Sequence, residues 1–227
     1  LIAPMRAVVL VGGFGTRLRP LTYQTPKPML PVGHRPVIEL VVEQLGRGGV
    51  TEVVLALGFK PGPFLVAFPD GECAGLPLRY AVEPEPFDTA GAIRFAARFA
   101  DIDDTFVVVN GDVLTDLDVA ALVAFHHAHA AEATLHLTTV EDPSAFGVAV
   151  VDTGGRVGRF VEKPPPGTEP SRLINAGTYV LEPSVLERIP GGRKVSIERE
   201  TFPAMVVAGS LYAMDTDDYW VLSLIHI

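Results

Sequence analysis

A glycine-rich segment near the amino end constrains this chain more than any other feature. It covers Leu10–Pro20, which reads LVGGFGTRLRP, and it follows an apolar run that predicts a strand. Closely spaced glycines permit a sharp turn and let backbone N–H groups approach a ligand, and successive N–H groups in such a turn bind anions. Three cationic side chains follow in the sequence, namely Arg17, Arg19 and Lys27. The segment therefore predicts a loop that binds a triphosphate.

Two common glycine-rich phosphate sites do not fit this segment. A mononucleotide P-loop requires Gly-x-x-x-x-Gly-Lys followed by Ser or Thr, and neither Gly-Lys-Ser nor Gly-Lys-Thr occurs in the chain. A dinucleotide fingerprint requires Gly-x-Gly-x-x-Gly at the start of a helix. Counted from Gly13, its third glycine would stand at Leu18, and Pro20 would interrupt the helix.

The segment reads Gly-Gly-x-Gly-Thr-Arg, then Leu-x-Pro-Leu-Thr, and Lys-Pro follows at 27–28. In this it resembles the signature of nucleotide-sugar pyrophosphorylases, the nucleotidyltransferases that join a nucleoside triphosphate to a sugar 1-phosphate. The resemblance implies a set of nucleotide-binding residues: Leu10, Gly12, Gly13, Gly15, Thr16, Arg17, Glu83 and Gly91. A tight strand-to-loop turn with incidental cations is the alternative.

Composition limits the partners and the compartment. The formal charge of −9 argues against a nucleic-acid partner, and cations within the first 27 residues are enough to explain the predicted anion site. No apolar run approaches the ~20 residues needed to cross a bilayer, so no membrane partner is expected. Cys73 is the only cysteine, which fits a reducing, cytoplasmic location. The sequence leaves a homo-oligomer possible in principle and does not decide it.

Short apolar runs alternate with helical patterns, which predicts an α/β domain with a mostly parallel sheet. Strands are expected at 6–11, 52–57, 78–82, 105–109, 134–140, 147–151, 156–162 and 176–181, and helices at 36–45, 63–68, 89–99 and 118–131. The resemblance implies a Rossmann-like mixed sheet flanked by helices, with an antiparallel sugar-binding subregion. We expect one nucleotidyltransferase domain over 5–220, with a nucleotide-binding half at 5–140 and a sugar-phosphate half at 141–220.

An acidic residue follows one of the buried strands. Asn110–Asp112 reads Asn-Gly-Asp and comes directly after the run at 105–109. A carboxylate at the carboxyl end of a parallel strand lies where open α/β sheets bind ligands. Beside a triphosphate it is suited to hold Mg²⁺, which prefers oxygen ligands. In the resembled family this aspartate is a metal ligand, so Asp112 is expected to bind Mg²⁺ and to act in catalysis with Arg17 and Lys27; a capping or turn role is the alternative.

Glu83 begins the segment that contacts the nucleobase in the resembled family. Guanine presents two adjacent donors, which one carboxylate can accept together. Glu83 therefore favours GTP, unless it is an exposed charge at the end of a strand. The family commonly has glycine where this chain has Asp88, which puts a backbone contact to the base in doubt at that position.

Four residues of the second half match the sugar-phosphate site of the family: Gly147, Glu162, Lys163 and Asn175. The resemblance implies that the backbone of Gly147 and the side chains of Glu162 and Asn175 bind sugar hydroxyls, while Lys163 neutralises the phosphate. A charge pair within a hairpin is the alternative for Glu162 and Lys163. The segment Ser196–Glu200 is similar to the mannose-1-phosphate guanylyltransferase branch, which favours mannose.

Three histidines gather at 126, 127 and 129. Zinc sites need ligands that converge on one point, and the irregular spacing of these histidines on a predicted helix favours a solvated helix face. No Ser/His/Asp arrangement for nucleophilic catalysis is apparent in the sequence.

The chain departs from the family near its carboxyl end. The family carries a second metal-binding aspartate in a Trp-x-Asp-x-Gly-Thr type segment, and Leu222 stands at that place here. We interpret residues 221–227 as a non-native tail joined to a truncated domain.

These features together predict that the chain joins GTP and mannose 1-phosphate to give GDP-mannose and pyrophosphate. Two alternatives remain. The product could be an ADP-, UDP- or dTDP-glucose, or the chain could be a catalytically silent subunit that binds a nucleotide sugar without making it.

Overall fold

A parallel sheet forms the centre of the fold, as the sequence predicted. The computed structural model describes residues 5–13, 15, 18–58 and 61–222. Four strands run parallel and lie side by side in the order β6 (Leu76–Val82), β4 (Val50–Leu57), β1 (Met5–Leu10) and β7 (Phe106–Asn110). The middle strands are almost wholly apolar because helices cover both of their faces.

Antiparallel strands extend this sheet beyond β7. They are β12 (Leu173–Leu181), β9 (Ala133–Thr139), and the hairpin β10 (Gly147–Val151) and β11 (Val157–Glu162). β13 (Leu211–Asp215) pairs parallel with β9, and β5 (Glu72–Cys73) closes the opposite edge on β6. Within the described residues the central sheet therefore has ten strands.

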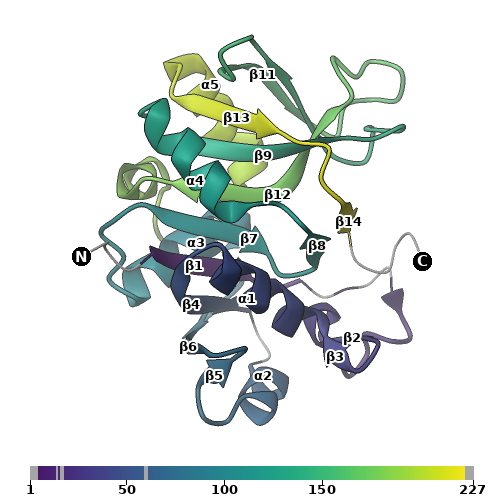
Figure 1. Cartoon of the computed structure of the whole chain (residues 1–227), viewed down its shortest axis with the longest axis vertical. Helices are drawn as coiled ribbons and strands as arrows, with labels where there is room; N and C mark the ends of the chain where they lie inside the picture. The colour runs from purple at the N-terminus through teal and green to yellow at the C-terminus, as the bar shows by residue number, and fades with distance from the viewer. Residues whose placement is uncertain (1–4, 14, 16–17, 59–60, 223–227) are drawn as a thin grey trace.

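Helices cover the two faces of the sheet (Figure 1). α1 (Val37–Arg47) and α4 (Val119–Ala128) lie on one face, and α3 (Asp88–Phe99) and α5 (Phe202–Ala208) lie on the other. Side chains of a strand alternate between faces, so Ala7 and Val9 of β1 pack on the side of α1, whereas Val8 packs on the side of α3.

Shorter elements surround this core. The remaining ones are α2 (Gly62–Ala67), the 3-10 helices η2 (Lys27–Met29) and η3 (Pro183–Arg188), the π-helix η4 (Ile197–Thr201), the ribbon of β2 (Pro31–Val32) with β3 (Arg35–Pro36), and the ribbon of β8 (Val113–Thr115) with β14 (Trp220–Leu222). In the described part of the chain, no helix is long and apolar enough to span a membrane.

The sheet runs across the predicted boundary between the two halves. β9 belongs to the first half by sequence, but it pairs with β12 and β13 of the second half. The division near residue 140 therefore stays a prediction, and the two parts share one continuous sheet.

Candidate functional site

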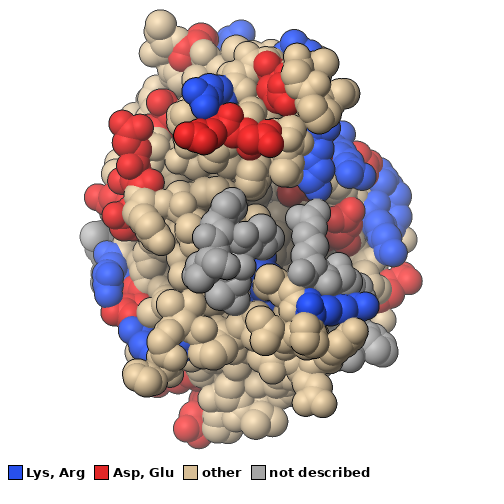
Figure 2. Space-filling view, turned by 90° about the vertical axis from the view of Figure 1, so that its right-hand side faces the viewer, with Lys and Arg blue, Asp and Glu red and all other residues tan. Residues whose placement is uncertain are grey.

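A cavity of about 520 Å³ lies at the carboxyl ends of β1, β4 and β7. This is the edge at which parallel sheets of α/β proteins bind ligands. The carboxyl ends of these strands point to the right in Figure 1, and Figure 2 looks onto that side of the molecule. The residues singled out from the sequence that line this cavity are Leu10, Gly12, Gly13, Gly15, Lys27, Glu83 and Asp112.

The glycine loop leaves β1 beside the end of β4. A Cβ on Gly12 would lie 3.4 Å from the amide nitrogen of Gly58, so two glycine backbones pass close to each other here. Gly15 has φ +56°, and a Cβ on it would lie 2.9 Å from Cγ2 of Thr22. Gly13 differs, because a Cβ there would meet no heavy atom of the described residues within 4 Å. Among these residues there is room for a side chain at Gly13, and the absence of one exposes the backbone.

The turn after β7 fixes Asp112 at the edge of this cavity. The N–H of Gly111 donates to the carbonyl of Leu10 at 2.9 Å. A Cβ on Gly111 would lie 2.7 Å from Cγ1 of Val11 and 3.0 Å from that same carbonyl oxygen. Only glycine allows this turn to pack against the end of β1, and that packing positions the next residue, Asp112.

Lys27 and Asp112 form an ion pair through Nζ and Oδ2. Lys27 comes from η2 and is buried, whereas the side chain of Asp112 is 27% exposed. A buried ammonium group requires a charged partner, and Asp112 supplies it.

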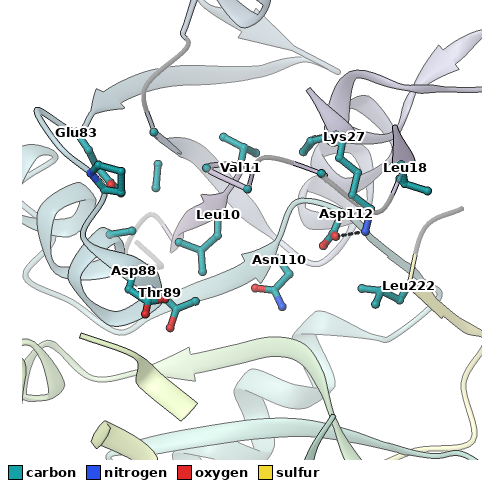
Figure 3. Close-up of a pocket in the computed structure, with 18 residues that line it drawn as sticks. Leu10, Val11, Leu18, Lys27, Glu83, Asp88, Thr89, Asn110, Asp112 and Leu222 are labelled. Carbon is teal, nitrogen blue, oxygen red and sulfur yellow. Dashed lines mark hydrogen bonds and ion pairs between the residues drawn. The ribbon is translucent and has the colours of Figure 1, made fainter. Parts of the chain in front are cut away.

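Glu83 lies at the opposite end of the cavity from this ion pair, with Leu10 and Asn110 between them (Figure 3). Glu83 is buried, and its Oε2 accepts the N–H of Phe87 at 3.0 Å. Burial raises the pKa of the Glu83 carboxyl, and the Phe87 N–H partly opposes that shift. The alternative that Glu83 is an exposed charge at a strand end is therefore wrong.

The segment after Glu83 enters α3 with an unusual backbone. Asp88 has φ +63°, a conformation that favours glycine and that aspartate tolerates better than most residues. Its Oδ1 accepts the N–H of Thr89 at 2.8 Å, and both residues line the cavity. The geometry explains why glycine suits this position in the resembled family.

The predicted sugar-binding residues Gly147 and Glu162 face each other across the β10–β11 hairpin. A Cβ on Gly147 would lie 2.9 Å from Oε2 of Glu162 and 2.6 Å from Cζ of Phe160, so the carboxylate stands directly over the glycine backbone. Lys163 contacts Glu162 at 3.4 Å between Nζ and Oε1. Burial raises the pKa of Glu162, and the nearby charge of Glu198 raises it further.

Asn175 has a structural role that the sequence did not predict. Its Nδ2 donates to the hydroxyl of Tyr179 at 2.9 Å, and its Oδ1 accepts the N–H of Gly177 at 3.0 Å. These bonds span the irregularity of β12, where the register with β9 shifts between Asn175 and Tyr179. Asn175 therefore holds the bend that brings Gly177 against Asn110. A Cβ added to Gly177 would lie 2.6 Å from Nδ2 of Asn110.

Glu198 is the acidic residue of this second part that sequence reasoning missed. Its Oε2 accepts hydrogen bonds from the hydroxyls of Thr89 and Ser196, each at 2.8 Å. Thr89 also lines the large cavity, so Glu198 links the nucleotide half to the vicinity of Glu162. The segment Ser196–Glu200 was noticed for its similarity to a family branch, but nothing in its residues alone indicated this contact.

Not all predicted nucleotide-binding residues reach the cavity. Thr16 and Arg17 lie outside the described residues. Gly91 is buried in α3, where its N–H donates to the carbonyl of Val195 at 3.3 Å, and it does not line the cavity. Arg19 stacks on the ring of Tyr23 at 5.4 Å and lines a neighbouring space instead. Conversely, Gly58 lines the cavity and was missed, although a glycine directly after a buried strand is a signal for such a position.

Leu222 stands at the mouth of the cavity near Asp112 (Figure 3). β14 places it there by pairing antiparallel with β8, with Leu222 opposite Val113. The indole Nε1 of Trp220 donates to the carbonyl of Ala176 at 2.8 Å and fixes the strand. Leu222 thus presents an apolar side chain at the position where the resemblance implies a carboxylate.

The interpretation of the histidine cluster as a solvated helix face is wrong for His126, whereas His127 is exposed. His126 is buried, with Nδ1 2.8 Å from Oγ1 of Thr134 and Nε2 3.0 Å from Oε1 of Glu182. Burial lowers the pKa of His126, and Glu182 opposes that shift. His127 lies close enough to complete a group with His126 and Glu182 that could hold a metal ion, but the existing hydrogen bonds already satisfy both nitrogens of His126.

The chain is similar to known proteins along most of its length. Residues 6–221 match the family model described as Nucleotidyl transferase. The chain is 44% identical over 218 residues to the mannose-1-phosphate guanylyltransferase of Mycobacterium tuberculosis, covering 94% of this chain and 59% of the relative. It is 44% identical over 221 residues to the mannose-1-phosphate guanyltransferase of Schizosaccharomyces pombe, covering 96% and 60%. The chain thus spans about 60% of the length of these curated relatives.

A solved structure matches along most of both chains. HddC from Yersinia pseudotuberculosis, complexed with GMP-PN, superposes with a TM-score of 0.78 at 28% identity, covering 96% of this chain and 92% of that chain.

Proposed function

This chain belongs to the nucleotidyl transferase family, and we propose that it joins GTP and mannose 1-phosphate to give GDP-mannose and pyrophosphate. The observation that best supports the proposal is that the two ends of one cavity differ. A buried carboxylate lies at one end, and a lysine–aspartate pair beside a glycine loop lies at the other. The names of the two curated relatives and the GMP-PN complex of HddC support the choice of guanine and mannose.

The guanine base is proposed to lie at the Glu83 end. Oε2 of Glu83 accepts the Phe87 N–H, and the carboxylate keeps further acceptor capacity for the two adjacent donors of guanine. Uracil and thymine present one donor flanked by acceptors, and an amide side chain would suit them better. The triphosphate would then extend along Leu10 and reach the backbone of Gly12 and Gly13.

The reaction requires little proton transfer from the protein. An oxygen of the sugar phosphate attacks the α-phosphorus of GTP, the bond to the β-phosphate oxygen breaks, and pyrophosphate leaves. The second pKa of a phosphate monoester is about 6, so the nucleophile is already ionised at neutral pH. The difficulty is to bring two polyanions together, and the protein contributes by positioning and by charge stabilisation. Lys27 and Lys163 are proposed to neutralise the α-phosphate of GTP and the sugar phosphate. Arg17 is proposed to hold the pyrophosphate that leaves.

The residues present fit a magnesium ion only in part. Mg²⁺ is commonly held by one or two carboxylates together with substrate phosphates and water. Asp112 offers one carboxylate that faces the cavity, while the adjacent Leu222 offers none. We propose that Asp112 holds the ion, which when bound would offset phosphate charge.

The single buried cysteine, Cys73, agrees with a reducing cytosol, and we propose that compartment.

The sugar phosphate is proposed to bind beside the β10–β11 hairpin. Gly147 and Glu162 offer a backbone group and a carboxylate to sugar hydroxyls, and Lys163 offers a cation. Asn175 would act mainly by holding the bend of β12, since both ends of its amide already bond within the protein.

A panel of substrates tests the proposal. Pyrophosphate release should be measured for GTP, ATP, UTP and dTTP, each with mannose 1-phosphate and with glucose 1-phosphate. We expect GTP with mannose 1-phosphate to be the preferred pair. Preference for another pair would replace the assigned product by a glucose-linked one. Tight GDP-mannose binding without any turnover would instead favour a silent binding subunit, a reading that the apolar Leu222 beside Asp112 supports.

A further inference from the structure

A second, smaller cavity lies on the solvent side of α3, away from the nucleotide cavity. Its volume is about 170 Å³, and it lies between α3 and the loop at 190–193. It shares no lining residue with the larger cavity. Three arginines line it, namely Arg94 and Arg98 from α3 and Arg193 from the loop. Such a density of cations is notable in a chain with a formal charge of −9.

The three arginines differ in how their charges are met. Arg98 pairs with Glu187, and Arg193 pairs with Glu200 at 2.7 Å. Arg94 forms no ion pair and no hydrogen bond from its side chain to any other residue that the structure describes, and its Nε is buried without a partner. A guanidinium is always charged and carries five donors, and leaving a buried donor unsatisfied is costly. Half-buried Arg94 is therefore the arginine of this cavity whose charge no carboxylate of the described residues meets.

The surroundings of Arg94 suit a compact anion. A Cβ on Gly191 would lie 2.8 Å from Nη1 of Arg94, so the guanidinium lies against bare backbone. Gly192 follows with φ +72°, so two consecutive glycines without side chains line the cavity beside Arg94. The rings of Phe87 and Phe95, with centroids 5.8 Å apart, form an apolar wall. The cavity thus has the guanidinium group of Arg94, an apolar wall of two phenylalanine rings, and room for a small anion.

We propose that this cavity binds the phosphoryl group of a small phosphorylated molecule. A guanidinium matches phosphate oxygens in a bidentate way, and Arg98 and Arg193 add positive charge at the same opening. The volume admits a phosphoryl group but not a whole nucleotide, so the rest of the molecule would project outward along the phenylalanine wall. The inference does not depend on the proposed catalytic activity.

The structure supplies a reporter for such binding. Phe87 lines the small cavity through its ring, while its N–H donates to Glu83 in the large one. The carbonyl of Phe87 also accepts the N–H of Val195 at 2.9 Å, which ties this residue to the segment that follows the arginine loop. Phosphate bound beside Arg94 should therefore perturb the amide resonance of Phe87.

The test is a titration of the full chain with inorganic phosphate, followed by ¹H–¹⁵N NMR at constant ionic strength. The Nε–H signal of Arg94 is identified by its loss in Arg94→Gln. We expect this signal and the Phe87 amide to shift together and to saturate. Arg94→Gln should weaken the phosphate response of Phe87 by about 10- to 100-fold, the scale of a charged hydrogen bond. Arg47→Gln, which removes the same charge from the exposed end of α1, should leave it unchanged.

Further arms separate the alternatives. Lys27→Met removes a cation of the large cavity, and the shift at Arg94 should persist in that variant. Acetate should bind more weakly than phosphate, and Arg94→Lys, which keeps the charge but loses the fork, should bind with intermediate affinity. No saturable shift at Arg94, equal affinity in Arg94→Gln, loss of the response in Lys27→Met, or equal binding of acetate would each overturn the proposal.

Discussion

At the scale of single residues, the proposed choice of guanine depends on Glu83. It is a buried carboxylate with one backbone donor of its own protein, Phe87 N–H, and it faces the cavity that would hold the base. A buried charge that gains only one hydrogen bond is costly in the free protein. A ligand with two adjacent donors would offset that cost, which gives a physical reason to keep glutamate at this position.

Glu83→Gln should therefore lower the preference for GTP and stabilise the free protein. Losing charged hydrogen bonds to guanine should reduce kcat/KM for GTP by about 10- to 100-fold. Burial raises the pKa of Glu83, so the folded state binds more protons than the unfolded state between the ordinary and the raised pKa, and stability falls as pH rises through this window. The variant should have the larger free energy of unfolding above the raised pKa.

Urea unfolding at several pH values measures this stability difference. The two proteins should converge below the ordinary glutamate pKa of about 4.3. A variant that is less stable than the parent at pH 7, or that keeps its GTP preference, would contradict the role of Glu83.

The proposed charge chemistry at the other end of the cavity depends on the Lys27–Asp112 pair. Asp112→Asn keeps the size and a hydrogen-bonding group but removes the charge, so turnover should fall by about 10²–10³-fold, the scale of one lost electrostatic contact. Because buried Lys27 then loses its charged partner, stability should fall as well. Steady-state kinetics across a range of Mg²⁺ concentrations, together with thermal unfolding, measures both effects. Near-parental turnover would exclude Asp112 from the reaction.

Leu222 offers a gain-of-function prediction next to Asp112. Leu222→Asp adds a second carboxylate at the mouth of the cavity, so half-maximal activity should need less Mg²⁺, since two carboxylates hold the ion better than one. Val221→Asp is the matched control, because successive side chains of a strand point to opposite faces. An equal effect of both substitutions, or none at Leu222, would argue against a metal at this place.

At the scale of elements, the turns at the ends of β1 and β7 contain glycines of two kinds. One kind is required by the packing of the fold, and the other leaves space beside the backbone. A Cβ on Gly111 would have no room, whereas a Cβ on Gly13 would meet no atom of the described residues within 4 Å. Gly111→Ala should therefore destabilise the protein by about 1–3 kcal/mol through overpacking and displace Asp112.

Gly13→Ala should change stability by no more than about 0.5 kcal/mol, yet it should weaken nucleotide binding because its methyl group would occupy space next to the phosphates. Denaturant unfolding and calorimetry with GTP measure the two quantities. If Gly13→Ala bound GTP as well as the parent does, the loop would not approach the phosphates.

The elements that the sequence predicted are those with strong periodicity or composition. Apolar runs predicted β1, β4 and β7, and the expected hairpin over 147–162 is present as β10 and β11. The predicted helix at 118–131 is shorter, because Asp118 caps α4 by accepting the N–H of Ala121 at 3.1 Å. The sequence pattern placed Asp118 inside the helix. An aspartate side chain stabilises a helix more at the N-cap, because there it accepts a free backbone N–H.

The elements that escaped prediction are short and depend on distant partners. β13 has five residues and is stabilised by pairing with β9. The π-helix η4 begins at Ile197, where Oγ of Ser196 accepts the N–H of Arg199 at 3.2 Å. The ribbon of β8 and β14 joins segments far apart in the chain. Local sequence does not contain these pairings, because they exist only after the sheet has assembled.

At the scale of the whole molecule, the sheet determines which predicted residues meet. Leu10, Glu83 and Asp112 come from separate stretches of sequence, and they line one cavity because β1, β6 and β7 run parallel and end at the same edge. Family resemblance predicted this set of residues, and strand topology explains it. The same topology turns Gly91 away into α3 and brings Gly58 and Glu198 toward the site, which no motif indicated.

Above all, we propose that this one cavity holds a guanine nucleotide in a fixed direction. The decisive measurement is a crystal structure of the chain soaked with a non-hydrolysable GTP analogue. We expect guanine within hydrogen-bonding distance of the Glu83 carboxylate and the triphosphate against the backbone of Gly12 and Gly13, beside Lys27. A nucleotide bound elsewhere, or bound with its base beside Asp112, would overturn the proposal.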